Sequence, residues 1–288
     1  MLFRPIRQLA DRFNTLQMGM VASERVFKIL DTEAQIEGSG KNLTPEINGD
    51  ISFKDVHFAY NNEDWVLKGI SFEVKKGQKV AIVGATGAGK SSIINLLSRS
   101  YEYNKGSISV DGTELRDFDS AYLSRQVGVV LQDVFLFSDS IYNNITLNNP
   151  KITLEEVQIA AKKVGAHRFI DKLPEGYNFN VKERGGMLSV GQRQLLAFIR
   201  AYIYNPSILV LDEATSSVDT ETEQMINEAI EFITKDRTSI IIAHRLATVQ
   251  HADLIIVMDQ GEIVEMGSHQ ELLRKDGEYR KLYDLQFV

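Results

Sequence analysis

The stretch Gly84-Ala-Thr-Gly-Ala-Gly-Lys-Ser91 (GATGAGKS) decides the fold class of this 288-residue chain. It matches the pattern G-x-x-x-x-G-K-[ST] in full. The apolar run KVAIVG (79–84) leads into it, and the helical pattern SIINLLSR (92–99) follows it. Glycines let backbone N–H groups curl around phosphate oxygens, and the start of the next helix adds partial positive charge. The context therefore predicts a phosphate loop, Gly84–Ser91, between a buried strand and a helix.

Within the phosphate loop, side chains and backbone together are expected to bind the phosphates of a nucleotide. We expect Lys90 to reach the β- and γ-phosphates and the Ser91 hydroxyl to ligate Mg²⁺. The predicted nucleotide-binding residues here are Gly84, Thr86, Gly87, Ala88, Gly89, Lys90, Ser91 and Ser92. A chance glycine-rich turn is the alternative, and the flanking strand and helix argue against it.

Outward from the loop, short apolar or alternating runs predict strands. They are ISFKDVHFAY (51–60), LKGISFEV (67–74), SISVDG (107–112), VGVVL (127–131), SILVLD (207–212) and SIIIAH (239–244). Turns are predicted at Lys76-Gly77 and Asp111-Gly112. Helical patterns separate the later runs, so we expect an α/β sheet with parallel strands.

Residues 134–186 carry few strand signals and predict a small helical insertion. Thr153 and Glu156 form a capping-box pattern before LEEVQIAAKKV (154–164), and Gly165 is suited to end that helix.

A pair of acids, Asp212 and Glu213, follows the apolar run SILVL (207–211). In a phosphoryl-transfer site one acid holds Mg²⁺ and a neighbour orients the attacking water. We therefore predict Asp212 as a metal ligand and Glu213 as a catalytic residue. Two solvated carboxylates at a strand end are the alternative.

The segment LSVGQ, Leu188–Gln192, opens the helical pattern that runs on to Tyr202. This signature segment resembles the signature of ATP-binding cassette (ABC) proteins, usually written LSGGQ, and departs from it at Val190. A helix N-terminus is a ready-made anion site. The resemblance implies that Ser189, Gly191 and Gln192 contact a γ-phosphate. An ordinary N-cap at Ser189 is the alternative.

Further residues match the family in its order along the chain. Gln132 resembles the Q-loop glutamine, which contacts Mg²⁺ or water, and His244 resembles the switch histidine that reads the γ-phosphate. Asp219 resembles the D-loop residue that contacts the opposite subunit, or it serves as an N-cap. Tyr60 resembles the aromatic residue that stacks on adenine; a core tyrosine, or Trp65 in that role, is the alternative.

The resemblance implies an α/β fold: a P-loop NTPase (RecA-like) core with a parallel sheet, an antiparallel β subdomain and an α-helical subdomain. It also implies ATP and Mg²⁺ as ligands, and a second nucleotide-binding domain as partner. Two such domains would close head to tail, each supplying its signature segment to the other's nucleotide. VKERGG (181–186) is similar to the stretch that faces membrane-domain loops in exporters; a solvated charged loop is the alternative.

Composition narrows the function classes. The net charge is −7, from 32 Lys and Arg against 39 Asp and Glu, which argues against a protein held mainly by nucleic-acid phosphates. The chain has no cysteine, so disulfides, thiolate catalysis and Cys-based metal sites are excluded. No run approaches 18 apolar residues, so no spanning helix is predicted.

The first 31 residues place Ile6, Leu9, Phe13, Leu16 and Met20 at helical spacing, and a polar, glycine-containing linker follows at 37–50. This helix is similar to the cytosolic end of the last transmembrane helix of ABC exporters; a freestanding helix is the alternative. The resemblance divides the chain into that extension plus linker (1–45) and a nucleotide-binding domain (46–288).

We therefore expect a piece of a multidrug- or lipid-exporter-like bacterial subunit, working at the cytoplasmic face of the membrane with a transmembrane domain as partner. A soluble ABC ATPase acting on nucleic acid or ribosomes, and a nucleotide-binding regulator without turnover, are the alternatives. A salt-dependent binding test on RNA and DNA, and a measurement of phosphate release, would separate them.

Overall fold

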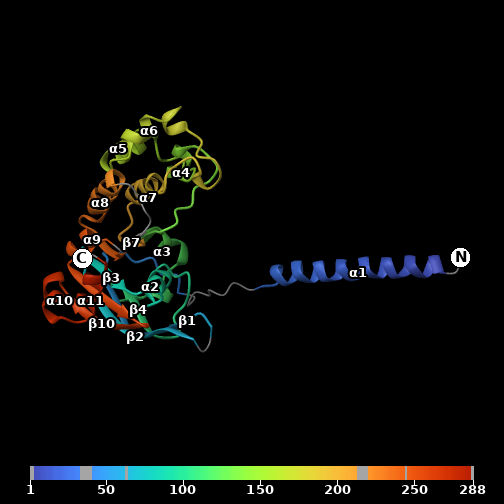
Figure 1. The fold of residues 1–288 in the computed structure, drawn as a ribbon, viewed down its shortest axis with the longest axis horizontal. Coiled ribbons are helices and arrows are strands. Elements are labelled where there is room, and N and C mark those ends of the chain that lie inside the picture. Colours follow the sequence, from blue (N-terminus) through green and yellow to red (C-terminus); the bar gives the residue numbers. More distant parts are fainter. Residues whose placement is uncertain (1–2, 33–40, 62–63, 213–219, 244, 287–288) are drawn as a thin grey trace. The chain divides into compact units, whose positions relative to one another are not determined.

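The strand that leads into the phosphate loop, β3 (Lys79–Gly84), lies inside a six-stranded sheet of order β10-β9-β3-β8-β7-β6 (Figure 1). Four strands of this sheet run parallel to β3: β9 (Leu254–Asp259), β8 (Thr238–Ile242), β7 (Ile208–Asp212) and β6 (Val127–Val130). All five residues of β8 are buried, which is typical of β-branched runs in a parallel sheet covered on both faces. The predicted parallel sheet is confirmed.

This computed structural model describes residues 3–32, 41–61, 64–212, 220–243 and 245–286. The chain forms two compact units, Met1–Glu37 and Gly38–Val288. Both sheets belong to the second unit, in which the backbone N–H of Leu43 donates to the carbonyl of Asp117 and the N–H of Asp119 donates to the carbonyl of Leu43.

A second sheet is antiparallel and has the order β2-β1-β4-β5. It contains β2 (Trp65–Val74), β1 (Ile51–Ala59), β4 (Lys105–Val110) and β5 (Thr113–Glu114). The β4-β5 hairpin turns at Asp111-Gly112, where φ is +49° and +76°, the left-handed pair that a two-residue hairpin turn requires. The turn and the three longer strands agree with the sequence prediction.

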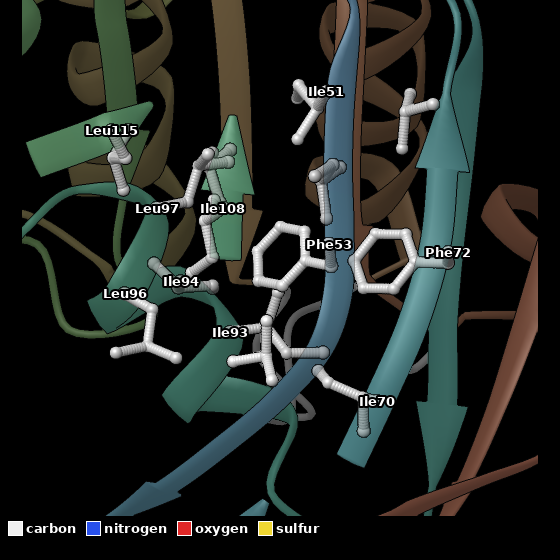
Figure 2. Close-up of a cluster of buried hydrophobic side chains, with 14 of the residues drawn as sticks. Ile51, Phe53, Ile70, Phe72, Ile93, Ile94, Leu96, Leu97, Ile108 and Leu115 are labelled. Carbon is white, nitrogen blue, oxygen red and sulfur yellow. The ribbon is translucent and has the colours of Figure 1, made fainter. Parts of the chain in front are cut away.

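The helix after the phosphate loop, α2 (Lys90–Leu97), is buried among side chains of both sheets. Figure 2 shows Ile93, Ile94, Leu96 and Leu97 of this helix beside the stacked rings of Phe53 and Phe72, whose centroids lie 4.5 Å apart. Burial of a large aliphatic side chain is worth about 1.5–3 kcal/mol. Because α2 is anchored in this way, the end that faces the loop is held rigidly.

Residues 134–186 contain α4 (Ile141–Thr146), α5 (Leu154–Lys163) and α6 (His167–Asp171), together with two 3₁₀ turns (Gly176–Asn178 and Glu183–Gly185). The Thr153–Glu156 capping box is present as predicted. These helices share a core with α7 (Val190–Tyr204) and α8 (Thr220–Thr234), which pack against β7 of the parallel sheet. Helix α3 (Ser120–Gln126) precedes β6, the strand at one edge of the six-stranded sheet.

The C-terminal region holds elements that the sequence analysis did not identify. Strand β9 is followed by β10 (Glu262–Gly267), and the hairpin turns at Gln260-Gly261 with φ of +45° and +88°. After these come α10 (His269–Lys275) and α11 (Glu278–Gln286), and α9 (Leu246–Gln250) precedes them. The turn residues and the apolar run LIIVMD (254–259) are the signals that could have found the hairpin.

The described residues of the first unit contain one helix, α1 (Phe3–Leu30), and none of them is buried. The helical prediction for this segment is confirmed, and its apolar side chains lie exposed, among them Phe3 at 84% and Leu9 at 75%. Within the described ranges of the chain, no helix combines the length and the apolarity that a membrane crossing needs.

Candidate nucleotide-binding site

The phosphate loop approaches two other backbones so closely that only glycine fits at two positions. At Gly84 φ is +150°, and a Cβ would lie 2.2 Å from the carbonyl oxygen of Met258 in β9. At Gly89 φ is +98°, and a Cβ would lie 3.0 Å from the carbonyl oxygen of Val66 in β2 and 2.8 Å from the side chain of Leu67. Gly87 also has a positive φ, of +84°. The loop therefore has the curled backbone that a ring of amide donors requires.

The side chain of Lys90 is folded back onto the loop that carries it. Its Nζ donates to the carbonyl of Gly84 at 2.8 Å and to that of Ala85 at 2.9 Å, and the residue is only 7% exposed. Burial lowers the pKa of Lys90, and the charge of Asp212 opposes this shift. The ammonium thus lies inside the loop, held by two oxygens that phosphate oxygens could replace.

The phosphate loop opens into a cavity of about 540 Å³, here called the loop cavity. Its lining includes the predicted residues Gly84, Thr86, Gly87, Gly89, Lys90, Ser91, Ser92, Gln132 and Asp212, together with Val66 and Ile242. Ala88, also predicted, is buried beneath the loop and accepts a hydrogen bond from the N–H of Gly261 at 3.2 Å. The structure therefore brings the phosphate loop, the glutamine and the acid together.

Sheet order explains why these residues meet. Gly84 ends β3, Ile242 ends β8, Asp212 ends β7, and Gln132 follows β6, four neighbouring parallel strands. The carboxyl ends of parallel strands share one edge of the sheet, which is where ligands of open α/β sheets bind. Burial raises the pKa of Asp212, and the charge of Lys90 opposes the shift. Perturbed titrating groups of this kind in a cavity are typical of functional sites.

Three predicted site residues, Glu213, Asp219 and His244, lie outside the residues that the structure describes. Glu213 directly follows Asp212, and His244 directly follows Ala243 after β8.

Gly261 supports the phosphate loop and was missed by the sequence analysis. Besides the bond to Ala88, its carbonyl accepts the N–H of Lys68 at 2.9 Å, so the β9-β10 turn ties the loop to β2. A Cβ at Gly261 would lie 2.3 Å from the carbonyl of Val66, a residue that lines the loop cavity. The Gln260-Gly261 pair was a readable turn signal, but its contact with the loop is visible only in three dimensions.

Tyr60, the predicted adenine platform, follows β1 and reaches the start of α2. Its hydroxyl lies 3.1 Å from Oγ of Ser92, which lines the loop cavity, and its side chain remains accessible, with 45% of the residue exposed. Trp65, the alternative platform, packs edge-on against His57 at 5.7 Å, and Lys105 lies 5.3 Å from its ring. The contact with Ser92 favours Tyr60.

The signature segment forms the closed N-terminus of α7. Ser189 is the N-cap, and its Oγ accepts the N–H of Gln192 at 3.2 Å while Oε1 of Gln192 accepts the N–H of Ser189 at 3.0 Å. Gly191 is buried, and Val190 is 37% exposed. Among the described residues, none of Leu188–Gln192 lines the loop cavity, so this chain does not bring its own signature to its own phosphate loop.

The backbone of the segment before the signature is hydrogen-bonded to Arg193 in the first turn of α7. Arg193 donates from Nη1 to the carbonyl of Leu188 at 2.7 Å, and Gly185, with φ of +68°, lies against Leu136. Lys182, Glu183 and Arg184 are exposed around this anchor.

Comparisons with known proteins agree with this geometry. A family model described as ABC transporter matches residues 67–216. YheH of Bacillus subtilis, described as a probable multidrug resistance ABC transporter ATP-binding/permease protein, is 45% identical over 99% of this chain and 42% of its own length. An ATP-dependent lipid A-core flippase of Saccharophagus degradans is 43% identical over 99% of this chain and 48% of its own length.

Among solved structures, a bacterial Atm1-family ABC exporter with ATP bound matches with a TM-score of 0.86 and 39% identity, over 100% of this chain and 50% of that one. The chain thus spans about half the length of the relatives it matches. With the phosphate loop, the acid at the end of β7 and the signature segment all in place, the chain belongs to the ABC transporter family and contains its nucleotide-binding domain.

Proposed function

We propose that this chain is the ATP-hydrolysing motor domain of an ABC exporter subunit. The observation that carries the proposal is the loop cavity, in which Lys90, Gln132 and Asp212 meet at one edge of the parallel sheet. The relatives described as multidrug transporter and lipid flippase support export over the alternative of a soluble ATPase acting on nucleic acid.

The residues of the loop cavity fit a magnesium nucleotide. Its floor is the curled glycine backbone, and Ser91, Gln132 and Asp212 offer the hydroxyl, amide and carboxylate oxygens that a hard divalent cation prefers. Mg²⁺ bound there would neutralise charge on the β- and γ-phosphates. Lys90 would exchange the carbonyls of Gly84 and Ala85 for phosphate oxygens. The negative phosphate would then stabilise the charged ammonium, which burial disfavours.

Hydrolysis would depend on Glu213 and His244, which come after β7 and β8 in the sequence. Glu213 would orient or deprotonate the attacking water, whose oxygen bonds to the γ-phosphorus as the bond to the bridging oxygen breaks. Lys90 and His244 would stabilise the charge that develops on the transferred group. Phosphate and ADP are the products.

The second half of each site would come from another copy of the domain. Ser189, Gly191 and Gln192 are built as a helix N-terminus, the structure that binds anions, yet this end lies away from the chain's own loop cavity. A head-to-tail pair would bring each signature segment to the opposite γ-phosphate, with Asp219 at the contact between subunits. ATP would then hold the pair closed, and hydrolysis would release it.

A second cavity, separate from the loop cavity, would contact the membrane partner. A cavity of about 520 Å³ lies beside the Gln132 segment and is lined by exposed apolar side chains, including Leu131, Phe135 and Phe137. Because Gln132 faces the loop cavity while its neighbours face this second cavity, nucleotide and partner would act on one short segment. Residues 1–45 would be the cytosolic extension of the last transmembrane helix with its linker, placing the domain at the cytoplasmic face of a membrane.

The deciding experiment measures Mg²⁺-dependent phosphate release from ATP against protein concentration for wild type and Glu213→Gln. We expect specific activity that rises with concentration and falls by about 10²–10⁴ in the variant, the range for a lost acid–base group, with ATP binding retained. Glu155→Gln, which changes an exposed carboxylate in the first turn of α5, is the matched control.

Unchanged hydrolysis in Glu213→Gln would disprove the role of Glu213. If the wild type binds ATP but releases no phosphate at any protein concentration, the result would instead favour a nucleotide-binding regulator.

A further inference from the structure

The hydroxyl of Tyr60 is held by two side chains of the helix that begins at the phosphate loop. Asn95 donates from Nδ2 to this hydroxyl at 2.9 Å, and Oγ of Ser92 lies 3.1 Å from it. Both residues belong to α2, which is buried in the core. The position of the Tyr60 ring therefore depends on α2 as well as on its own segment after β1.

Asn95 is also hydrogen-bonded to the backbone of Tyr101, whose ring lies next to that of Tyr60. Its backbone carbonyl accepts the N–H groups of Ser100 at 2.9 Å and Tyr101 at 3.3 Å. The ring of Tyr101 meets that of Tyr60 at an angle of 89°, with centroids 4.9 Å apart. The ring of Phe58 lies 4.6 Å from Tyr60 at 76°. One asparagine thus anchors the phenol end of Tyr60 and the ring that abuts it.

The neighbours of Tyr60 leave room for a planar ligand. Both ring contacts are nearly perpendicular, and within the described part of the chain no aromatic ring stacks parallel to Tyr60. With 45% of the residue exposed, a flat group can stack on the ring. A fixed ring loses little conformational entropy when a ligand stacks on it.

The hydroxyl of Tyr60 is also connected to the loop cavity. The phenolic oxygen accepts from Nδ2 of Asn95 and is also hydrogen-bonded to Oγ of Ser92. Ser92 is 4% exposed and lines the loop cavity. The hydrogen bonds between Asn95, Tyr60 and Ser92 thus link the stacking ring to the residue that follows the phosphate loop.

We propose that Asn95 is a positioning residue for the nucleobase: it holds Tyr60 ready for stacking and so contributes to ATP affinity through the base rather than through the phosphates. This inference rests on the proposed binding of ATP in the loop cavity. Asn95 itself is not a catalytic residue, since it acts through Tyr60.

The test compares Mg²⁺-ATP with inorganic tripolyphosphate, which has the phosphates and no base, by calorimetric titration of the full chain. Asn95→Leu is expected to weaken ATP binding about three- to tenfold, the value of one net hydrogen bond, and to leave tripolyphosphate binding unchanged. Tyr60→Phe, which keeps the ring but removes the hydroxyl and its bonds to Asn95 and Ser92, should give a selective loss at least as large. The double variant should lose no more than Tyr60→Phe alone, because that variant already removes the acceptor of the Asn95 hydrogen bond.

Asn143→Leu is the matched control, since Asn143 is a half-buried helical asparagine whose Nδ2 donates to Asp139 at the same distance of 2.9 Å. It should leave the ratio of the two affinities unchanged. Equal weakening of both ligands by Asn95→Leu, or no weakening of ATP, would overturn the proposal. If Asn95→Leu fails to fold, Tyr60→Phe decides by the same criterion. A wild-type chain that binds neither ligand would refute the proposed function itself.

Discussion

Helices α2 and α7 both begin at a segment assigned to phosphate binding, yet their N-termini are capped in different ways. At α2 the N-cap is Gly89, in a left-handed conformation with no side-chain hydrogen bond to the first turn. At α7 the N-cap is Ser189, and it forms a complete capping box with Gln192. One end is left open to a ligand, whereas the other is already closed by its own side chains.

This difference fits the partners that each end would meet. The end of α2 lies in a cavity beside a buried ammonium, so an anion can satisfy its amide donors at once. The end of α7 is exposed and would contact nucleotide only in a closed pair, so it needs a cap that keeps the helix intact in the meantime. The capping box supplies about 1 kcal/mol for that purpose.

The largest expected effect tests the open end. Lys90→Met should weaken ATP binding roughly 100-fold, about 2.7 kcal/mol, because it removes a charged donor to the phosphates. Calorimetric titration measures the loss, with Lys151→Met, at an exposed lysine elsewhere, as control. Normal ATP affinity in Lys90→Met would contradict the assignment of the phosphate loop.

A smaller effect is expected from pH. Burial lowers the pKa of Lys90 from its ordinary value of 10.5, so rising pH should remove its charge earlier than that of an exposed lysine. Because the charged form binds phosphate, ATP affinity should fall on the alkaline side, by at most about tenfold per pH unit for one proton. Titration across an alkaline pH series measures the slope. Lys90→Met should lack it, and equal slopes in both proteins would remove Lys90 as the cause.

The smallest effect tests the closed end. Ser189→Ala should lower the free energy of unfolding by about 1 kcal/mol, because the N–H of Gln192 loses its acceptor. ATP affinity measured at low protein concentration should not change, since Ser189 lies outside the loop cavity, but phosphate release that depends on concentration should fall.

Ser268→Ala is the matched control for that variant, because Ser268 forms the same capping box with Glu271 at the start of α10. Thermal unfolding should report a similar loss for both serines, and phosphate release should fall only for Ser189→Ala. Equal phosphate release in the two variants would show that Ser189 acts only as an N-cap and has no role in hydrolysis.

Local patterns made much of the fold predictable. The run KVAIVG before Gly84, the Thr153–Glu156 capping box and the Asp111-Gly112 turn depend on neighbours a few residues away, and each is present in the structure. The hairpin of β9 and β10 was readable in the same way but was not identified. The roles of Glu213, Asp219 and His244 stay predictions.

The sequence by itself determined the chemistry of the site: a glycine loop with Lys90 and Ser91, an acid after an apolar strand, and a serine that caps a helix. These features are local, because backbone hydrogen bonding and side-chain spacing act over a few residues. Tertiary structure alone decided that Gln132 and Asp212 line one cavity with Lys90, that Gly261 is hydrogen-bonded to the loop, and that Asn95 is hydrogen-bonded to Tyr60. These contacts depend on strand order and on the burial of α2 among both sheets, which no short stretch of sequence specifies.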